Sequence, residues 1–98
     1  MFGLDDKYIT FIKDTLAKYV PLENAKFYVF GSRAKNIYKP YSDVDIAIDY
    51  GGFSDILKSK IEFEFENSTF PYMVDIVDLN SASEEFKNEI SPTLISLF

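Results

Sequence analysis

The apolar residues near the start of the chain recur at the spacing of a helix. They are Tyr8, Ile9, Ile12, Leu16 and Tyr19. An apolar stripe with this period turns one face of a helix toward a core, and a following proline ends a helix because it has no backbone N–H. With an Asp-rich start and Pro21 after the end, the pattern predicts an amphipathic helix from Asp5 to about Tyr19.

Three short runs of apolar residues, rich in aromatic or β-branched side chains, predict strands. They cover residues 27–30, 44–49 and 73 to about 79. Such side chains suit a pleated surface, and each run is bounded by Gly or Pro. Gly31 ends the first strand, and we expect Ser32 to cap a short helix that continues to Tyr38.

The segment from Phe53 to about Asn67 is predicted as a helix with a charged outer face. Lys58 with Glu62 and Lys60 with Glu64 stand four residues apart, which favours ion pairs along the helix. In its second half, Glu alternates with apolar residues at period two, so an early end followed by extended chain stays open as the alternative.

The last predicted element is a helix after Ser83, since Ser83-Glu84-Glu85-Phe86 is typical of a capped helix start. Together the elements predict an α/β (α+β) fold, with helices packed against a small mixed sheet. The 98 residues suffice for one core, so we expect one domain over 1–98 and no further acceptor-binding lobe.

The composition limits which side chains can bind a metal or act as acid and base. The chain has no Cys and no His, so disulfides and thiolate zinc sites are excluded, and acid, base or metal chemistry must fall to carboxylates. A net charge of -6 disfavours long nucleic acid as a partner. Neither a membrane span nor a signal peptide is recognisable, so we expect no membrane partner and a cytoplasmic protein. Self-association into a homo-oligomer stays open.

The candidate chemistry lies between the first two strands. Gly31-Ser32 follows the first strand, and Asp43 and Asp45 straddle the start of the second, with ten residues between Ser32 and Asp43. A glycine at a strand end lets backbone N–H groups approach a phosphate, and the serine adds a hydroxyl where the helix dipole favours anions. Alternate strand residues share a face, so the two carboxylates converge and repel each other unless a cation lies between them. Since Mg²⁺ prefers carboxylate and phosphate oxygens, the pattern predicts a magnesium–triphosphate site.

Two further acids lie on the third strand. Asp75 is embedded in the apolar run Val74-Asp75-Ile76-Val77, where an acid needs a partner, either a lysine or the same metal site. Asp78 is three positions further and therefore faces the other side of the strand. We interpret Asp78 as an ordinary surface charge.

These residues resemble the minimal nucleotidyltransferases of the DNA polymerase beta superfamily. That family has a Gly-Ser, a gap of similar length, an Asp-x-Asp and a later strand-borne Asp. The positions that match in order, within about residues 27–79, are Gly31, Ser32, Asp43, Asp45 and Asp75. Many members have Gly where this chain has Asn36, but Asn tolerates a left-handed backbone, so we expect the turn to survive.

The resemblance implies a polymerase-beta-type fold and a role for each matched position. Asp43 and Asp45 would hold two Mg²⁺ ions, while Asp75 would ligate one ion and help to activate the acceptor hydroxyl. The Gly-Ser turn would hold the triphosphate. Arg33, which follows this turn, is our candidate for a further nucleotide-binding residue, ahead of the neighbouring lysines.

The leading functional hypothesis is therefore an enzyme that transfers a nucleoside monophosphate, AMP from ATP in the first instance, to a protein hydroxyl. The resemblance further implies a HEPN-domain protein as partner, in a toxin–antitoxin pair whose toxin is silenced by the transferase. One alternative is a non-catalytic nucleotide-binding or partner-binding module. Another is transfer to a small molecule such as an aminoglycoside, or to RNA, which the acidic charge disfavours.

Overall fold

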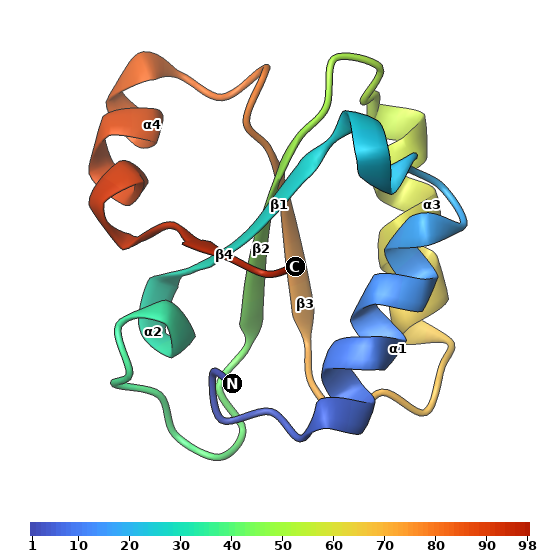
Figure 1. The fold of residues 1–98 in the computed structure, drawn as a ribbon, viewed down its shortest axis with the longest axis vertical. Coiled ribbons are helices and arrows are strands. Elements are labelled where there is room, and N and C mark those ends of the chain that lie inside the picture. Colours follow the sequence, from blue (N-terminus) through green and yellow to red (C-terminus); the bar gives the residue numbers. More distant parts are fainter.

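A computed structural model describes residues 1–98 (Figure 1). The helices and strands are α1 (Asp6–Ala17), β1 (Lys26–Phe30), α2 (Gly31–Ala34), β2 (Val44–Asp49), α3 (Asp55–Glu66), β3 (Val74–Asp78), α4 (Glu84–Ile90) and β4 (Ile95–Ser96). Short 3₁₀ turns, η1 (Leu22–Asn24) and η2 (Ser91–Thr93), precede β1 and β4. Each predicted element is present, and β4 is an addition. No helix has both the length and the apolar character needed to cross a bilayer.

The sheet is mixed, as predicted, with the strand order β3-β2-β1-β4. β1 is antiparallel to both of its neighbours, whereas β2 and β3 run parallel. The parallel connection is made by α3, as a crossover between parallel strands requires. β2 and β3 consequently begin at the same end of the sheet, the end at which β1 passes into α2 (Figure 1).

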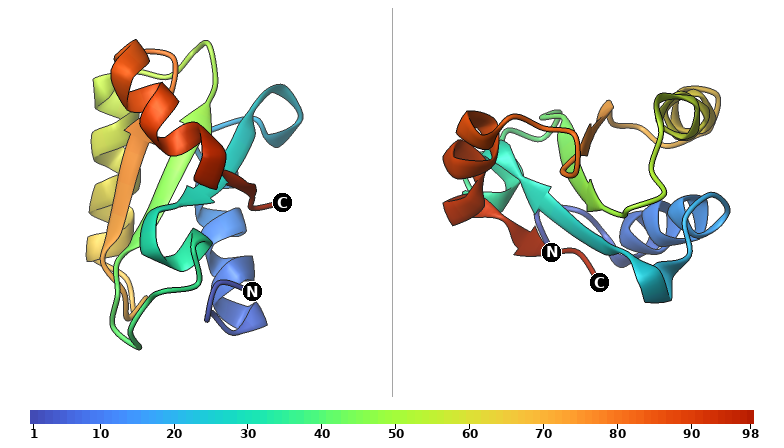
Figure 2. Two further views of the ribbon diagram at one scale, coloured as in Figure 1. Left: turned by 90° about the vertical axis from the view of Figure 1, so that its left-hand side faces the viewer. Right: turned by 90° about the horizontal axis from the view of Figure 1, so that it is seen from above.

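The two faces of the sheet are covered unequally. α1 and α3 pack on one face, where alternate strand residues such as Val29, Ile46 and Ile76 are fully buried. On the other face α4 buries a smaller cluster that contains Phe30, Ala47 and Ile90. α4 crosses only the upper part of that face, and the short helix α2 lies beside the end where β2 begins (Figure 2).

α3 is a continuous helix, so the alternative of an early end and extended chain is wrong. The Ser54 hydroxyl accepts a hydrogen bond from the Leu57 N–H (3.2 Å), and Ile61 and Phe65, one turn apart, are buried in the core. Helical spacing therefore decides the second half of the segment, because it places both apolar side chains against the sheet. The alternating glutamates lie on the remaining faces.

The ion pairs predicted along α3 do not form. Glu64 instead pairs with residues at the end of α1. Lys18 Nζ donates to Glu64 Oε2 and Tyr19 Oη donates to Glu64 Oε1, each at a distance of 2.6 Å. The other ion pair of the structure, Glu84 with Lys87, lies within α4. Packing of α1 against α3 brings Glu64 a bidentate set of donors that neighbours on its own helix cannot match.

α2 is shorter than predicted, and Ser32 does not cap it. The N-cap position is Phe30, which makes no side-chain hydrogen bond, and the helix ends at Ala34 instead of Tyr38. Asn36, with φ +60°, ends it in the left-handed conformation that the sequence led us to expect. Ser83 does cap α4, since its hydroxyl accepts from the Phe86 N–H.

The contact of Glu64 with α1 makes stability depend on pH. Hydrogen bonds from Lys18 and then Tyr19 lower the pKa of Glu64. A depressed folded-state pKa contributes stability above the unfolded value, about 4.3, which is lost as pH falls further. We expect Glu64→Gln to lower Tm slightly at pH 7 and to match the wild type below about pH 4. Glu62→Gln, the control, should leave Tm unchanged. Equal Tm values of Glu64→Gln and the wild type at pH 7 would show that the contact of Glu64 with Lys18 and Tyr19 does not stabilise the fold.

Candidate active site

Three acids predicted from the sequence converge on one face of the sheet. Asp43 directly precedes β2, Asp45 is the second residue of β2 and Asp75 is the second residue of β3. The parallel register pairs Asp45 with Asp75, so their side chains leave the sheet at the same level and on the same side. Asp43 precedes Asp45 by two residues and shares that side. They lie at the end of the face that α4 leaves uncovered (Figure 1).

The electrostatics of the cluster are those of uncompensated like charges. Burial raises the pKa of Asp45, and the neighbouring carboxylates Asp75 and then Asp43 raise it further. No lysine or arginine forms an ion pair with any of the three. The repulsion expected between Asp43 and Asp45 is thus present, and the register adds Asp75 to it. In this arrangement the carboxylates do not enclose a ready-made metal site.

Gly31 brings the backbone directly against Asp45. Its φ is +74°, and a Cβ built on it would overlap Asp45 Oδ2. The strand pair explains the approach, because Phe30 pairs with Asp45 and the chain turns into α2 immediately afterwards. Both the backbone conformation and the lack of space require glycine here. The predicted turn and the predicted carboxylates therefore form one site.

Ser32 and Arg33 follow the turn but have different surroundings. The Ser32 hydroxyl makes no hydrogen bond within the chain, and its carbonyl accepts from the Ile37 N–H (3.0 Å). Arg33, the only arginine of the chain, is 2% exposed. Its Nη1 donates to the Phe2 carbonyl (2.8 Å), and its Nε and Nη2 donate to the Ser42 carbonyl (3.1 and 2.8 Å).

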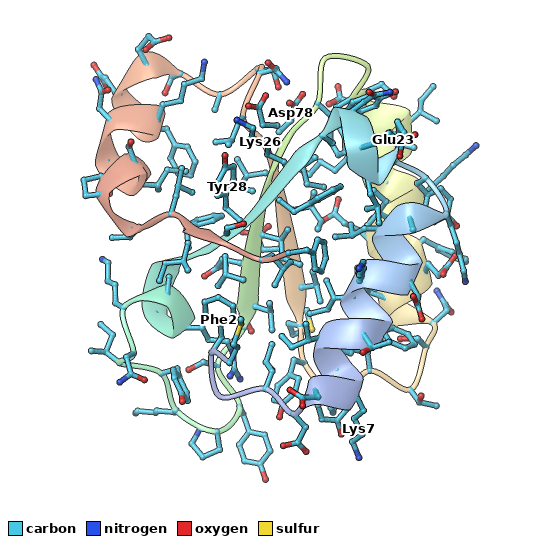
Figure 3. The ribbon with its side chains drawn as sticks, viewed as in Figure 1. Phe2, Lys7, Glu23, Lys26, Tyr28 and Asp78 are labelled. Carbon is cyan, nitrogen blue, oxygen red and sulfur yellow. The ribbon has the colours of Figure 1, made fainter.

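These contacts make Arg33 an internal clamp. Its guanidinium carbon also lies 5.0 Å from the ring centre of Tyr38 and 4.7 Å from that of Tyr72. A guanidinium committed in this way joins the amino-terminal segment, shown beside α2 in Figure 3 by Phe2, to the loop that leads into β2. The nucleotide-binding role that we predicted for Arg33 finds no support in this arrangement. A role in holding Ser42, and hence the adjacent Asp43, fits it.

Asp78 lies on the opposite face from the cluster, as strand parity predicted. It pairs with Ile48, a residue of the core beneath α1 and α3. Its carboxylate closes the turn after β3, because Oδ1 accepts from the Asn80 N–H (3.0 Å) and Oδ2 from the Ser81 hydroxyl (2.8 Å). Figure 3 shows Asp78 at the other end of the sheet from Phe2. It is therefore a turn-closing residue, which is a more specific role than the surface charge we expected.

Comparisons with known proteins show the family of the chain. The family model described as polymerase beta, nucleotidyltransferase, matches residues 11–98. A probable protein adenylyltransferase MntA of Haemophilus influenzae is 34% identical over 83 residues, which are 84% of this chain and 71% of that protein. The chain belongs to the polymerase beta nucleotidyltransferase family.

Solved structures show the same fold. A chain from the crystal structure of a toxin–antitoxin with AMP-PNP superposes with a TM-score of 0.76 at 25% identity, covering 97% of this chain and 73% of that one. A chain from the complex of tri-AMPylated Shewanella oneidensis HEPN toxin with MNT antitoxin has a TM-score of 0.73 at 23% identity, covering 97% and 72%. The polymerase-beta-type fold predicted from the sequence is confirmed.

Removing the charge of Asp45 should stabilise the metal-free protein. Its pKa is raised on folding, so its contribution to stability is present at low pH and is lost as pH rises through the folded-state pKa. We expect Asp45→Asn to raise Tm at pH 7 in the presence of a chelator, with a gain that disappears toward pH 4. Glu23→Gln, on the exposed turn before β1, is the control. A lower Tm for Asp45→Asn at pH 7 would contradict the repulsion.

Replacing Arg33 distinguishes a clamp from a phosphate ligand. Arg33→Met should lower the free energy of unfolding by about 3 kcal/mol, because buried carbonyls lose charged donors. The matched control is Lys35→Met on the exposed side of the same turn, which should be nearly neutral. Urea unfolding measures both. Unchanged stability of Arg33→Met together with weakened binding of AMP-PNP would instead return Arg33 to the nucleotide site.

Proposed function

We propose that this chain transfers AMP from ATP to a hydroxyl of a partner protein in the cytoplasm, and that the partner is a HEPN-domain toxin. The observation that carries the proposal is the alignment of Asp45 with Asp75 beside the Gly31 turn. This arrangement supports the proposal because paired carboxylates suit metal binding and proton transfer, and a glycine turn beside them suits phosphate.

The residues present fit Mg²⁺. The donors are carboxylates only, and hard oxygen donors are what this ion prefers. Asp45 is half-buried among like charges, so a cation relieves a repulsion that no side chain of the protein relieves. Two bound Mg²⁺ ions would supply positive charge to the triphosphate and make the acceptor hydroxyl more acidic. Asp43 and Asp45 would hold both, with Asp75 on the one nearer the acceptor.

The chain's own residues divide the remaining work. Backbone N–H groups of the turn at Gly31 and Ser32 face the triphosphate, and the Ser32 hydroxyl is free to donate to it. The acceptor oxygen attacks the α-phosphorus, the bond to the pyrophosphate oxygen breaks, and pyrophosphate leaves. The proton of the hydroxyl passes to Asp75, because the chain has no His or Cys and Asp75 is exposed to an incoming acceptor.

The choice of ATP and of a protein acceptor is supported by the relatives. One similar structure holds AMP-PNP, and the H. influenzae relative is described as a probable protein adenylyltransferase. A HEPN toxin carrying AMP groups is bound by the antitoxin in a further structure of the same fold. The net charge of -6 also suits a protein surface better than a nucleic acid.

The third acid separates an enzyme from a module that only binds. Asp75→Asn should keep most binding of Mg²⁺ with AMP-PNP, since Asp43 and Asp45 remain, but should lose at least about a hundredfold in transfer rate. The measurement is incorporation of label from α-labelled ATP, with γ-labelled ATP as the control, into co-expressed toxin. Asp78→Asn, the same change on the opposite face, should remain active.

Three results would contradict this account. An active Asp75→Asn with an inactive Asp78→Asn would show that the wrong acid has been assigned. Transfer from γ-labelled ATP would indicate a phosphotransferase. Label that appears only in small molecules would replace the protein acceptor with the aminoglycoside type of substrate.

A further inference from the structure

β3 forms an open edge of the sheet directly beside the active site. It is the outermost strand, and its one partner is β2. The Met73 carbonyl accepts from the Val44 N–H (2.8 Å) and the Leu79 N–H donates to the Ile48 carbonyl (2.9 Å), so the odd-numbered residues turn their backbone groups toward β2. In a parallel ladder the alternate residues, Val74 and Ile76, then direct their N–H and C=O groups outward. Two residues of β3 thus offer unused hydrogen-bonding groups on either side of Asp75.

A small cavity accompanies this edge on the side of α3. Its volume is about 210 Å³, and its apolar wall includes Phe65, Phe70, Met73 and Val74. Met73 is 66% exposed, so part of this apolar wall is open to solvent. The left view of Figure 2 shows β3 as the outer strand with α3 behind it. The cavity, which is lined by residues of α3 and by Val74 at the start of β3, adjoins this edge.

The charged side chains that line this cavity are all acidic. Glu62 and Glu66 of α3 line the cavity, and Asp75 projects from the other face of β3. None of these three acids takes part in an ion pair, and the lining of the cavity includes no lysine or arginine. A segment that pairs with this edge would therefore be favoured by positive charge.

We propose that the acceptor protein binds here as an extended basic segment that adds a strand to β3 and places its hydroxyl side chain opposite Asp75. Directly opposed residues of paired strands share a face and lie about 5 Å apart at Cβ, which brings the hydroxyl beside Asp75. The residues on either side of it turn to the face of Glu62 and Glu66 and should be basic, with their aliphatic stems along the apolar wall of the cavity. This assignment rests on the proposed protein acceptor and adds how that acceptor is recognised.

The competing explanation is that the acids merely protect the edge. Charged residues on edge strands prevent unwanted pairing, and Asp75 would then repel any added strand. The two accounts differ in what happens when a strand of suitable chemistry is supplied. A peptide can therefore decide between them without any transfer reaction.

The probe is a fluorescent peptide in which a central threonine is flanked directly by lysines and then by valines. We expect it to bind the wild-type protein in anisotropy measurements, and to slow hydrogen exchange of the Val74 and Ile76 amides. Val74→Pro removes one outward N–H at the first residue of an edge strand, where proline is tolerated, and should weaken binding about tenfold. Val74→Ala, which loses side-chain contact but keeps the N–H, should bind nearly as the wild type does.

Circular dichroism and Tm establish that both variants fold. A second peptide with glutamate in place of lysine should not bind. The proposal is overturned if the lysine peptide fails to bind the wild type, if Val74→Pro and Val74→Ala bind it equally, or if the Val74 and Ile76 amides gain no protection. Because these readouts need no ATP, their failure is distinct from a failure of adenylate transfer in the labelling assay.

Discussion

The structure depends on the parallel pairing of β2 with β3, which holds Asp45 and Asp75 side by side against their mutual repulsion. The register is determined on the opposite face, where Ile46 and Ile76, the next residue of each strand, are fully buried. A slip of one residue would expose the isoleucine of the strand that slips and bury its acid. Apolar packing under α1 and α3 therefore offsets the destabilising repulsion among the carboxylates on the other face of the same strands.

Two features hold the chain around that cluster without neutralising it. Gly31 allows the end of β1 to lie against Asp45, where any side chain would collide with the carboxylate. Arg33 gathers carbonyls from the amino-terminal segment and from the loop before β2, and so holds the residue next to Asp43. The one arginine of the chain thus stabilises the backbone, and the charge of the site is left for a ligand. The segment that contains Gly31 and Arg33 therefore stabilises the backbone around the carboxylates and leaves their repulsion in place.

Local sequence patterns predicted the helices, the strands and the faces on which the acidic residues lie. They did not predict contacts between segments that are distant in the sequence. Helical spacing and the alternation of strand faces placed Asp43, Asp45 and Asp75 correctly with respect to Asp78, because these depend on near neighbours along the chain. The pairing of Glu64 with α1 joins residues 46 positions apart, which no spacing within α3 indicates. The contacts of Arg33 escaped the sequence for the same reason, since its neighbours in sequence suggested a phosphate, whereas its hydrogen-bond and aromatic partners come from other segments. Its predicted role in nucleotide binding stays a prediction.

The central claim is that one end of the sheet binds both the metal and the triphosphate. Its most direct test is paramagnetic broadening of backbone amide resonances by Mn²⁺ in the presence of AMP-PNP. The account predicts broadening centred on Gly31, Ser32 and the residues around Asp43, Asp45 and Asp75, and weak without the nucleotide. Broadening centred on the opposite end of the sheet, near Asp78, or none at all, would contradict it.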